Sequence, residues 1–432
     1  MVQAKAGTGW LVAVVAAMTL LVTTGLWNPF PGLWDWMTRS RPLAEPAVHW
    51  QERLGGVPTT VTLLDRFVVV EQRESVEVRQ RASGRRVWET KADWAAIAGP
   101  PGRTVVVSGT LLKKGYEVRD AATGMVLRKD DKASAVWSFT NAMLDVSCRS
   151  SQDCEVQARE PASGDVLWRA GLPGIGFVLF ADNPKLGLGA TFSPERIELN
   201  SQLQPMPPLL AFPIDGRLHL VETSEGRVTA AVEPGKLTSV TVLGGRVVHS
   251  IATRSEGTCL IALTGRDGVS GAEVWRRPGY QLRTLSGAGC DQPKEPVSGG
   301  NAVLAVRPDG REALLDAGDG REVLTCETGE KVLATNGVYA VVLSADKSKV
   351  SAFQLGKAKA LWSRKAGADV SAVIGPKTVI ISEHTPDRIT MLDAVTGRVR
   401  TELRSEATVS AFDGTGVLLS DRRELGYVAL VD

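Results

Sequence analysis

The chain has 432 residues, 43% of them hydrophobic and 23% charged, and its 50 basic and 48 acidic residues give a formal net charge of +2. This composition is typical of a globular protein, and the length suits one large repeat domain or about three ordinary domains. No long run of Lys or Arg is present that could follow a line of phosphates, so we do not expect a nucleic-acid partner.

The N-terminal part of the chain contains an uncharged stretch of eighteen residues from Trp10 to Trp27. A helix over 10–27 would be about 27 Å long at about 1.5 Å per residue, enough to cross the hydrocarbon core of a bilayer. Because no clear Ala-x-Ala site follows, we predict a retained transmembrane helix, or uncleaved signal anchor, in preference to a cleaved signal peptide. Aromatic residues gather at the two ends as in an interfacial belt, namely Trp10, Trp27, Phe30, Trp34 and Trp36.

Both interpretations of this stretch place the bulk of the chain outside the cytoplasm. We predict a single-pass plasma-membrane protein with a cytoplasmic N-terminus at 1–9, a linker rich in Pro and Trp at 28–46, and an extracytoplasmic domain at 47–432. Charge alone gives little help with the orientation, because basic residues occur on both sides of the helix.

The five cysteines bear on the compartment. Cys148 and Cys154 enclose a short span between two apparent strands, and a disulfide could close this hairpin in an oxidising compartment. Cys259, Cys290 and Cys326 leave one thiol over, and which two of them pair depends on distances that the sequence does not give. The alternative is a cytosolic protein with five buried free thiols.

A repeated unit runs through the rest of the chain, in which a strand is followed by Asp-Ala-x-Thr-Gly and a second strand. The clearest copies are Asp120–Gly124 and Asp393–Gly397. The Asp can bond backbone N–H groups inside the turn, and the Gly can take the positive φ that such a hairpin loop requires. A repeat of about forty residues predicts a propeller or a related array. The turn glycines are expected at Gly84, Gly124, Gly164, Gly226, Gly271, Gly320 and Gly397, with a degenerate copy at Gly356.

Each unit also supplies an apolar strand without polar alternation, such as Phe67–Val70 or Thr378–Ile381. This pattern indicates burial on both faces, as expected for a blade between two neighbouring blades. A shorter strand after the turn often ends in Trp. These tryptophans are predicted to pack between blades in preference to stacking on a ligand, and they are Trp50, Trp88, Trp168, Trp275 and Trp362.

We therefore predict an all-β fold, a β-propeller of four-stranded blades. Eight blades are the preferred number, with seven or nine left open, because propellers typically have about four to eight. The segment Ala47–Trp50 is expected to complete the C-terminal blade and close the ring. A long interval between the third and fourth turns contains Phe192–Pro213, which is either a surface insertion or an eroded blade, and we predict a contact surface there.

The units Tyr116–Leu127 and Arg388–Val399 resemble the PQQ-like propeller repeat. That family includes quinoprotein alcohol and glucose dehydrogenases and the outer-membrane assembly lipoprotein BamB. The resemblance covers residues 47–432 and implies the ring fold, but the same ring hosts catalysis, scaffolding and ligand binding. A lipoprotein such as BamB needs an acylated Cys just after its signal, whereas the first Cys of this chain is Cys148.

Known quinoprotein dehydrogenases carry adjacent cysteines against the quinone and a cluster of Glu, Asn and Asp around calcium. This chain has no adjacent cysteines, so none of those site residues can be transferred to it. We predict no catalytic residue, no cofactor and no bound metal. The four histidines lie in no recognisable motif, and they are His49, His219, His249 and His384.

The preferred function is a non-enzymatic platform that binds a protein or an extracellular ligand, or that supports an assembly. The alternatives are a PQQ-dependent dehydrogenase and an extracellular sensor subunit that signals through another chain.

Overall fold

The computed structural model divides the chain into two compact units, Met1–Ala44 and Glu45–Asp432. The structure describes residues 48–111, 113–175, 205–229, 231–233, 238–255, 258–283, 298–299, 301–367, 369–384 and 387–430. The predicted N-terminus, membrane helix and linker at 1–9, 10–27 and 28–46 lie outside these ranges. Among the residues that are described, no helix is long and apolar enough to cross a membrane.

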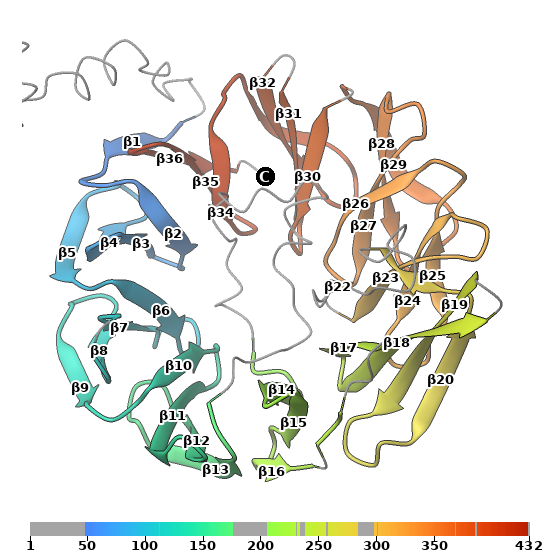
Figure 1. Ribbon diagram of the computed structural model, residues 1–432. Coiled ribbons are helices and arrows are strands. Elements are labelled where there is room, and N and C mark those ends of the chain that lie inside the picture. The colour runs from blue at the N-terminus through green and yellow to red at the C-terminus, as the bar shows by residue number, and fades with distance from the viewer. Residues whose placement is uncertain are drawn as a thin grey trace, which may run out of the picture. The chain divides into compact units, whose positions relative to one another are not determined.

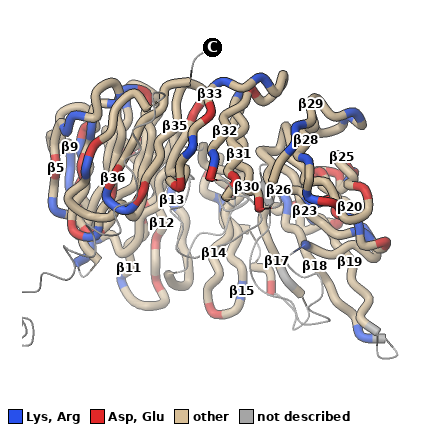
Figure 2. The backbone as a smooth tube through the Cα atoms, turned by 90° about the horizontal axis from the view of Figure 1, so that it is seen from above, with Lys and Arg blue, Asp and Glu red and all other residues tan. Residues whose placement is uncertain are grey.

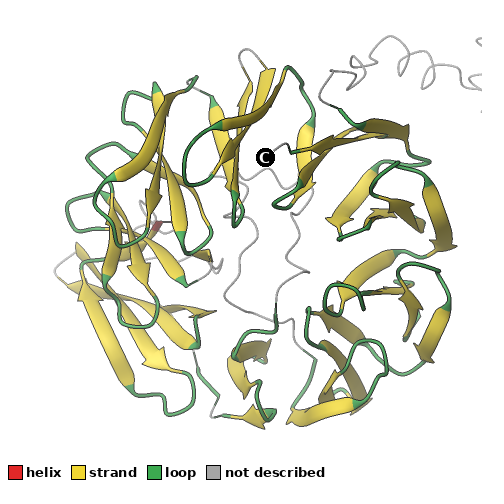
Figure 3. Ribbon diagram, turned by 180° about the vertical axis from the view of Figure 1, so that it is seen from behind, coloured by secondary structure: helices red, strands yellow, loops and turns green. Residues whose placement is uncertain are grey.

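The described part of the second unit is built from nine sheets arranged as the blades of a ring (Figure 1). Figure 3 shows strands joined by loops and turns, and Arg283 is the only helical residue among those described. The predicted all-β propeller is therefore confirmed, but the preferred number of eight blades was wrong. The sequence contains eight copies of the turn, and eight blades were expected for that reason; nine was one of the numbers left open. The ninth blade lacks such a turn because its strands come from both ends of the domain.

The first three blades follow one another without interruption. Blade 1 contains β2 (Pro58–Leu63), β3 (Phe67–Gln72), β4 (Ser75–Gln80) and β5 (Arg86–Lys91). Blade 2 contains β6 (Trp94–Ala98), β7 (Val105–Gly109), β8 (Tyr116–Asp120) and β9 (Val126–Asp130). Blade 3 contains β10 (Ala135–Ser138), β11 (Met143–Ser150), β12 (Asp153–Arg159) and β13 (Val166–Leu172).

The middle three blades are less regular. Blade 4 contains β14 (Leu209–Ile214), β15 (Arg217–Glu222) and β16 (Arg227–Val228). Blade 5 contains β17 (Thr238–Leu243), β18 (Arg246–Ser255), β19 (Thr258–Asp267) and β20 (Glu273–Pro278). Blade 6 contains β21 (Gln281–Leu282), β22 (Ser298–Gly299), β23 (Ala302–Val306), β24 (Glu312–Asp316) and β25 (Glu322–Thr325), and both β21 and β22 pair with β23.

The last three blades complete the ring. Blade 7 contains β26 (Lys331–Thr335), β27 (Tyr339–Leu343), β28 (Lys349–Gln354) and β29 (Ala360–Lys365). Blade 8 contains β30 (Val370–Ile374), β31 (Thr378–His384), β32 (Asp387–Asp393) and β33 (Val399–Leu403). Blade 9 contains β34 (Thr408–Phe412), β35 (Gly416–Asp421), β36 (Glu424–Ala429) and β1 (Trp50–Arg53).

The ring closes through β1, which pairs antiparallel with β36 and sets Trp50 opposite Tyr427. The prediction that the segment ending at Trp50 completes the C-terminal blade is confirmed, although the strand begins at Trp50 and Ala47 lies outside the described residues. Closure of this kind covers the free edge of the last sheet, which would otherwise be open to pairing with another chain.

Blade 4 occupies the end of the long interval between the third and fourth turns. Its turn glycine, Gly226, follows the second described strand, whereas the turns of blades 1 to 3 follow the third strand. Strand β14 therefore corresponds to the second strand of a full blade. Residues Leu209–Phe212 are buried in β14, so this part of the predicted contact surface was wrong, and 192–204 lie outside the described residues.

The hydrophobic core lies between blades. Each core cluster draws its residues from two neighbouring sheets; one joins Leu144 of blade 3 to Phe212 of blade 4, and another joins Leu63 of blade 1 to Leu418 of blade 9. The apolar strands are covered on both faces for this reason. In β3, for example, three consecutive valines at 68–70 are all buried.

The strands of a blade run antiparallel in sequence, so their connections alternate between two faces of the ring. We call one the turn face; it carries the turns with the repeated glycines, such as Gln80–Gly84 between β4 and β5. We call the other the hairpin face; it carries the hairpins between the second and third strands and the links from blade to blade. Figure 2 shows the ring edge-on, with both faces in profile.

Candidate functional site

The repeated turns have the geometry that their sequence requires. The seven predicted turn glycines have φ values between 68° and 80°. In the turn of blade 2, the Asp120 carboxylate accepts the backbone N–H groups of Ala122 at 3.1 Å and Thr123 at 2.8 Å. The Asp393 carboxylate holds the turn of blade 8 in the same way.

Each of the five predicted tryptophans contacts the turn glycine of the next blade, so together they cover five junctions of the ring. The Trp88 indole N–H donates to the carbonyl oxygen of Ala121 in blade 2, at 3.0 Å, and a Cβ added at Gly124 would lie 2.7 Å from the indole ring. Glycine is thus needed here for its φ and for the close approach of the ring. The same contact joins Trp50 to Gly84, Trp168 to Gly226, Trp275 to Gly320 and Trp362 to Gly397. These side chains pack between neighbouring blades.

An arginine takes the place of tryptophan between blades 2 and 3. A Cβ at Gly164 would lie 2.9 Å from the Arg128 side chain, which donates to the Tyr116 hydroxyl at 2.8 Å. That hydroxyl in turn donates to Asp145 at 2.8 Å, and Arg159 donates to the same carboxylate at 2.7 Å. Burial and the nearby Asp145 charge raise the pKa of Tyr116. The sequence contained a signal for this contact that was missed. Arg128 follows Leu127 at the same place in the repeat at which Trp88 follows Val87.

A second arginine pattern was also missed. Arg79, Arg119 and Arg159 each stand five residues before a turn glycine and donate to its carbonyl oxygen, at 2.8, 3.0 and 3.0 Å. This spacing was visible in the sequence as an extension of the repeat. Its role is structural, because it ties the third strand to the turn that follows.

Several side-chain hydrogen bonds join blades 1 and 9 where the ring closes. The Arg81 guanidinium of blade 1 donates to both oxygens of Asp413 in blade 9, at 2.7 and 2.9 Å, and to the Tyr427 hydroxyl at 2.9 Å. The Trp50 indole donates to the Arg81 carbonyl at 2.5 Å and stacks on Tyr427 with 5.8 Å between ring centroids. Burial would lower the pKa of Arg81, but the hydrogen bonds with Asp413 and Tyr427 raise it.

A hollow of about 520 Å³ lies beside this closure on the turn face. Buried Arg81 and Tyr427 form its floor, with the half-buried Phe67 and Gln80 around them. The exposed lining residues are His49, Asp65, Arg66 and Ala82. Sequence reasoning did not find this site, because its walls come from opposite ends of the chain.

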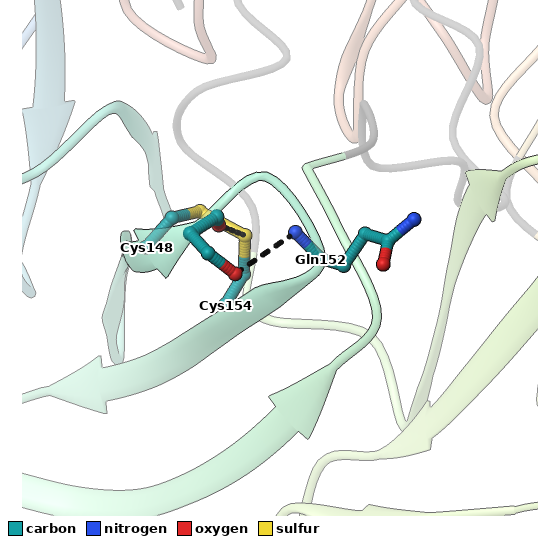
Figure 4. Close-up of a disulfide and its surroundings, with 4 residues drawn as sticks. Cys148, Gln152 and Cys154 are labelled. Atoms are coloured by element: carbon teal, nitrogen blue, oxygen red, sulfur yellow. Dashed lines mark hydrogen bonds between the residues drawn. A yellow bond between two sulfur atoms is a disulfide. The ribbon is translucent and has the colours of Figure 1, made fainter.

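The hairpin face carries a disulfide at the tip of β11–β12. Cys148 and Cys154 lie opposite each other in the two strands and are bonded, which confirms the predicted pair. Figure 4 shows the side chain of Gln152 projecting away from this bond at the tip. Arg149 and Asp153 flank it with 88% and 62% of their side chains exposed, and their charged groups lie 3.9 Å apart.

The sequence left open which of the other three cysteines form a disulfide, and the structure settles this for two of them. Cys259, near the tip of β18–β19, is disulfide-bonded, and Cys326 is a buried free thiol whose pKa is raised by burial to about 12. The alternative of five free thiols is therefore inconsistent with the structure. Cys290 lies outside the described residues.

Comparison with known proteins places the chain in a family. The family described as "Outer membrane protein assembly factor BamB" matches residues 152–400, more than half of the chain. The chain belongs to the BamB-like family of PQQ-type propellers. No curated protein matches it.

Solved structures similar to this member of the BamB-like family are remote in sequence. BamB from Moraxella catarrhalis is 14% identical, with 80% of this chain and 98% of that chain covered and a TM-score of 0.38. The quinohemoprotein alcohol dehydrogenase ADHIIG from Pseudomonas putida HK5 is 11% identical, with 91% and 77% covered and a TM-score of 0.43. The computationally designed Ika8 protein is 17% identical, with 78% and 98% covered and a TM-score of 0.40.

The resemblance of the repeat to quinoprotein dehydrogenases implies a quinone and a calcium ion in some propellers of this type, and two observations bear on whether this chain could hold them. Within the described ranges, no three His, Cys, Asp or Glu side chains come together in a way that could hold a metal ion. The sequence also lacks the adjacent cysteines that pack against the quinone. No set of described residues can be assigned to a quinone or a calcium ion, and we derive no reaction through these groups.

The four histidines are scattered over the ring. His49 lines the hollow, His219 lies in β15, and His384 lies at the end of β31 with its Nδ1 3.8 Å from Asp387. His249 lies in β18, where its Nε2 is buried without a hydrogen-bond partner. Burial, with a smaller contribution from the charge of Arg266, lowers the pKa of His249 to about 4.

Proposed function

We propose that this protein is an exported, membrane-anchored and non-enzymatic propeller that binds a partner protein through the hairpin face of blades 3 to 5. The anchor is the apolar segment 10–27. The description of the matching family as an assembly factor supports a role in which one protein positions another. Disulfides are typical of oxidising compartments, so the bonded cysteines support export.

The observation that carries this proposal is a group of three neighbouring hairpins on one face. The hairpins β11–β12, β14–β15 and β18–β19 point to the same side of the ring, along the lower edge in Figure 2. Two of them hold disulfide-bonded cysteines near their tips. A loop fixed in this way loses less conformational entropy when it binds a partner.

The hairpin tips present groups that suit a protein interface. The ion pair between Arg217 and Glu233 at blade 4 is 60% and 74% exposed, so both side chains can change partner at small cost. Leu260 on β19, near the tip of the hairpin of blade 5, is 59% exposed and offers an apolar contact. Exposed apolar side chains with a polar rim are typical of protein contact sites.

The hairpin face also lies away from the point where the described chain enters the ring. Val48 and His49 precede β1, and His49 lines the hollow on the turn face. The described chain therefore begins at the turn face, and the hairpins lie at the far end of the strands.

Photo-crosslinking in cells tests the proposed surface. A photoreactive amino acid at Gln152 or at Arg217 should give the same cross-linked partner, because both positions lie on hairpin tips. The matched controls are Ser83 and Lys377, which are exposed on the turn face. Equal cross-linking from both faces, or none from the hairpin tips, would contradict the proposal.

The non-enzymatic part of the proposal has its own test. The detergent-solubilised full chain is incubated with PQQ and calcium, and dye-linked alcohol oxidation is measured. We expect no activity above that of PQQ and calcium alone. Turnover that depends on the protein would replace the proposed function with that of a quinoprotein dehydrogenase.

A further inference from the structure

The hollow beside the ring closure has the dimensions of a ligand site. Its volume of about 520 Å³ lies within the range of about 300 to 1,000 Å³ that is usual for small-molecule sites. Four separate segments form it: the residue before β1, the turn between β2 and β3, the end of β4, and Tyr427 of β36 in blade 9. The hollow is on the turn face and is independent of the proposed partner surface.

The arginine in the floor of the hollow is fully occupied by the protein. The Arg81 Nε donates to Tyr427, Nη1 to Asp413 and to the carbonyl oxygens of Leu64 and Asp65, and Nη2 to Asp413 and to Thr415. A guanidinium has five N–H donors, so none is left for a ligand. Recognition of a bound molecule falls to the exposed lining residues.

Two of the exposed lining residues, Asp65 and Arg66, carry opposite charges. Neither the Asp65 carboxylate nor the Arg66 guanidinium forms an ion pair or a side-chain hydrogen bond with any part of the chain that the structure describes. They are neighbours in the turn between β2 and β3, and both line the hollow. Beside them the Phe67 and Tyr427 rings supply apolar surface.

We propose that the hollow binds a small zwitterion, in which an ammonium group and a phosphate or carboxylate are joined by a short carbon chain. Asp65 accepts hydrogen bonds from the ammonium group, and Arg66 donates to the anionic group. Hydrogen bonds between charged partners are about twice as strong as neutral ones. The carbon atoms between the charges lie against Phe67 and Tyr427. Such a group occurs in soluble metabolites and in the headgroup of phosphatidylethanolamine.

Titration calorimetry of the detergent-solubilised full chain with phosphoethanolamine tests this proposal. We expect saturable binding at least about tenfold tighter than that of inorganic phosphate or of ethylamine alone, because each carries half of the recognised charge. A tenfold change corresponds to about 1.4 kcal/mol. Binding of phosphate as tight as that of phosphoethanolamine, or no saturable binding, would overturn the proposal.

Single substitutions test which of the two charged residues contributes to binding. Asp65→Asn and Arg66→Gln should each weaken phosphoethanolamine binding at least about tenfold while thermal unfolding stays unchanged, since both side chains are exposed and unpaired. The control Arg85→Gln changes an exposed arginine that follows the turn between β4 and β5 and is not among the residues that line the hollow. An equal loss in the control would show non-specific charge binding and reject the site.

A short-chain phosphatidylethanolamine distinguishes the two sources of the group. Binding about tenfold tighter than that of phosphoethanolamine assigns the site to a lipid headgroup, and equal binding assigns it to a soluble ligand. A short-chain phosphatidylglycerol, which lacks the ammonium group, should bind at least about tenfold more weakly than the phosphatidylethanolamine in either case. Equal binding of the two lipids would contradict recognition by Asp65.

Discussion

The closure between blades 9 and 1 and the junction between blades 4 and 5 show two ways of joining similar sheets. At the closure, the Trp50 ring fills the space against Gly84, and Arg81 holds Asp413 across the junction. At the other junction, Gly271 has a similar left-handed φ of 69°, yet no atom of the described residues would lie within 4 Å of an added Cβ. Turn geometry is therefore a property of the hairpin, whereas the strength of a junction depends on the side chain that reaches it.

The two regions also differ in how completely their buried polar groups are hydrogen-bonded. The closure satisfies every donor of Arg81, while blade 5 contains buried polar atoms without a hydrogen-bond partner. Among the described residues of this blade, these atoms belong to Thr241, His249, Ser250, Thr264 and Arg266. Buried polar atoms of this kind cost stability, so we expect blade 5 to be among the least stable parts of the ring.

The largest effect is expected from breaking the closure. Asp413→Ala leaves the buried Arg81 charge without its carboxylate partner and should reduce the free energy of unfolding by about 3 kcal/mol. Chemical denaturation measures this change. The control Glu233→Ala removes an exposed ion pair and should cost less than about 1 kcal/mol. Equal effects of the two substitutions would show that the closure is no stronger than a surface pair.

A pair of glycine substitutions separates turn strain from the packing of tryptophan. Gly320→Ala places a Cβ 2.7 Å from the Trp275 ring at a φ of 71° and should cost about 3 kcal/mol. Gly271→Ala meets the same backbone strain in open space and should cost about 1 kcal/mol. Thermal or chemical unfolding compares them. A cost for Gly271→Ala as large as that for Gly320→Ala would contradict the account of an unfilled junction.

The buried histidine of blade 5 makes stability depend on pH. The pKa of His249 is about 4 in the folded chain, below its ordinary value of 6.5. Between these values the unfolded chain binds the proton and the folded chain does not, so stability is lost as pH falls from 6.5 towards 4. The midpoint of thermal unfolding should fall less between pH 7 and pH 5 in His249→Gln than in the unmodified chain. Identical pH profiles would reject this assignment.

The smallest expected effect distinguishes two tryptophans. The Trp275 indole N–H donates to the carbonyl oxygen of Ala317 at 2.8 Å, whereas the Trp168 indole N–H has no partner in the part of the chain that the structure describes. Replacement by Phe removes similar packing in both, but only Trp275→Phe loses a hydrogen bond. Trp275→Phe should therefore cost about 1 kcal/mol more than Trp168→Phe in chemical denaturation. The reverse order would contradict the assigned contacts.

Local features of this fold could be predicted from the sequence, because they depend on residues close together in the chain. The turns at Gly124 and Gly397 and the hairpin disulfide of Cys148 with Cys154 are of this kind. The number of blades could not be fixed, since the ninth blade combines β1 with β34 to β36 and contains no complete copy of the unit.

Contacts between distant residues were not predictable. Arg81 and Asp413 are 332 residues apart and carry no motif, so neither their ion pair nor the adjacent hollow was visible in the sequence. Arg128 was overlooked because the search for blade contacts considered tryptophan alone. The hairpin face emerged only when the positions of β11–β12 and β18–β19 in the ring were known.

The most direct test of the closed ring is a disulfide introduced across its closure. Arg53 in β1 lies opposite Glu424 in β36, so Arg53→Cys with Glu424→Cys should form an intramolecular disulfide on oxidation. It joins the two ends of the domain, and the oxidised monomer should migrate faster on a non-reducing denaturing gel. Arg53→Cys with Glu402→Cys in blade 8 serves as the control. Failure of the first pair to form the bond, or equal bonding in the control, would contradict a ring closed by β1.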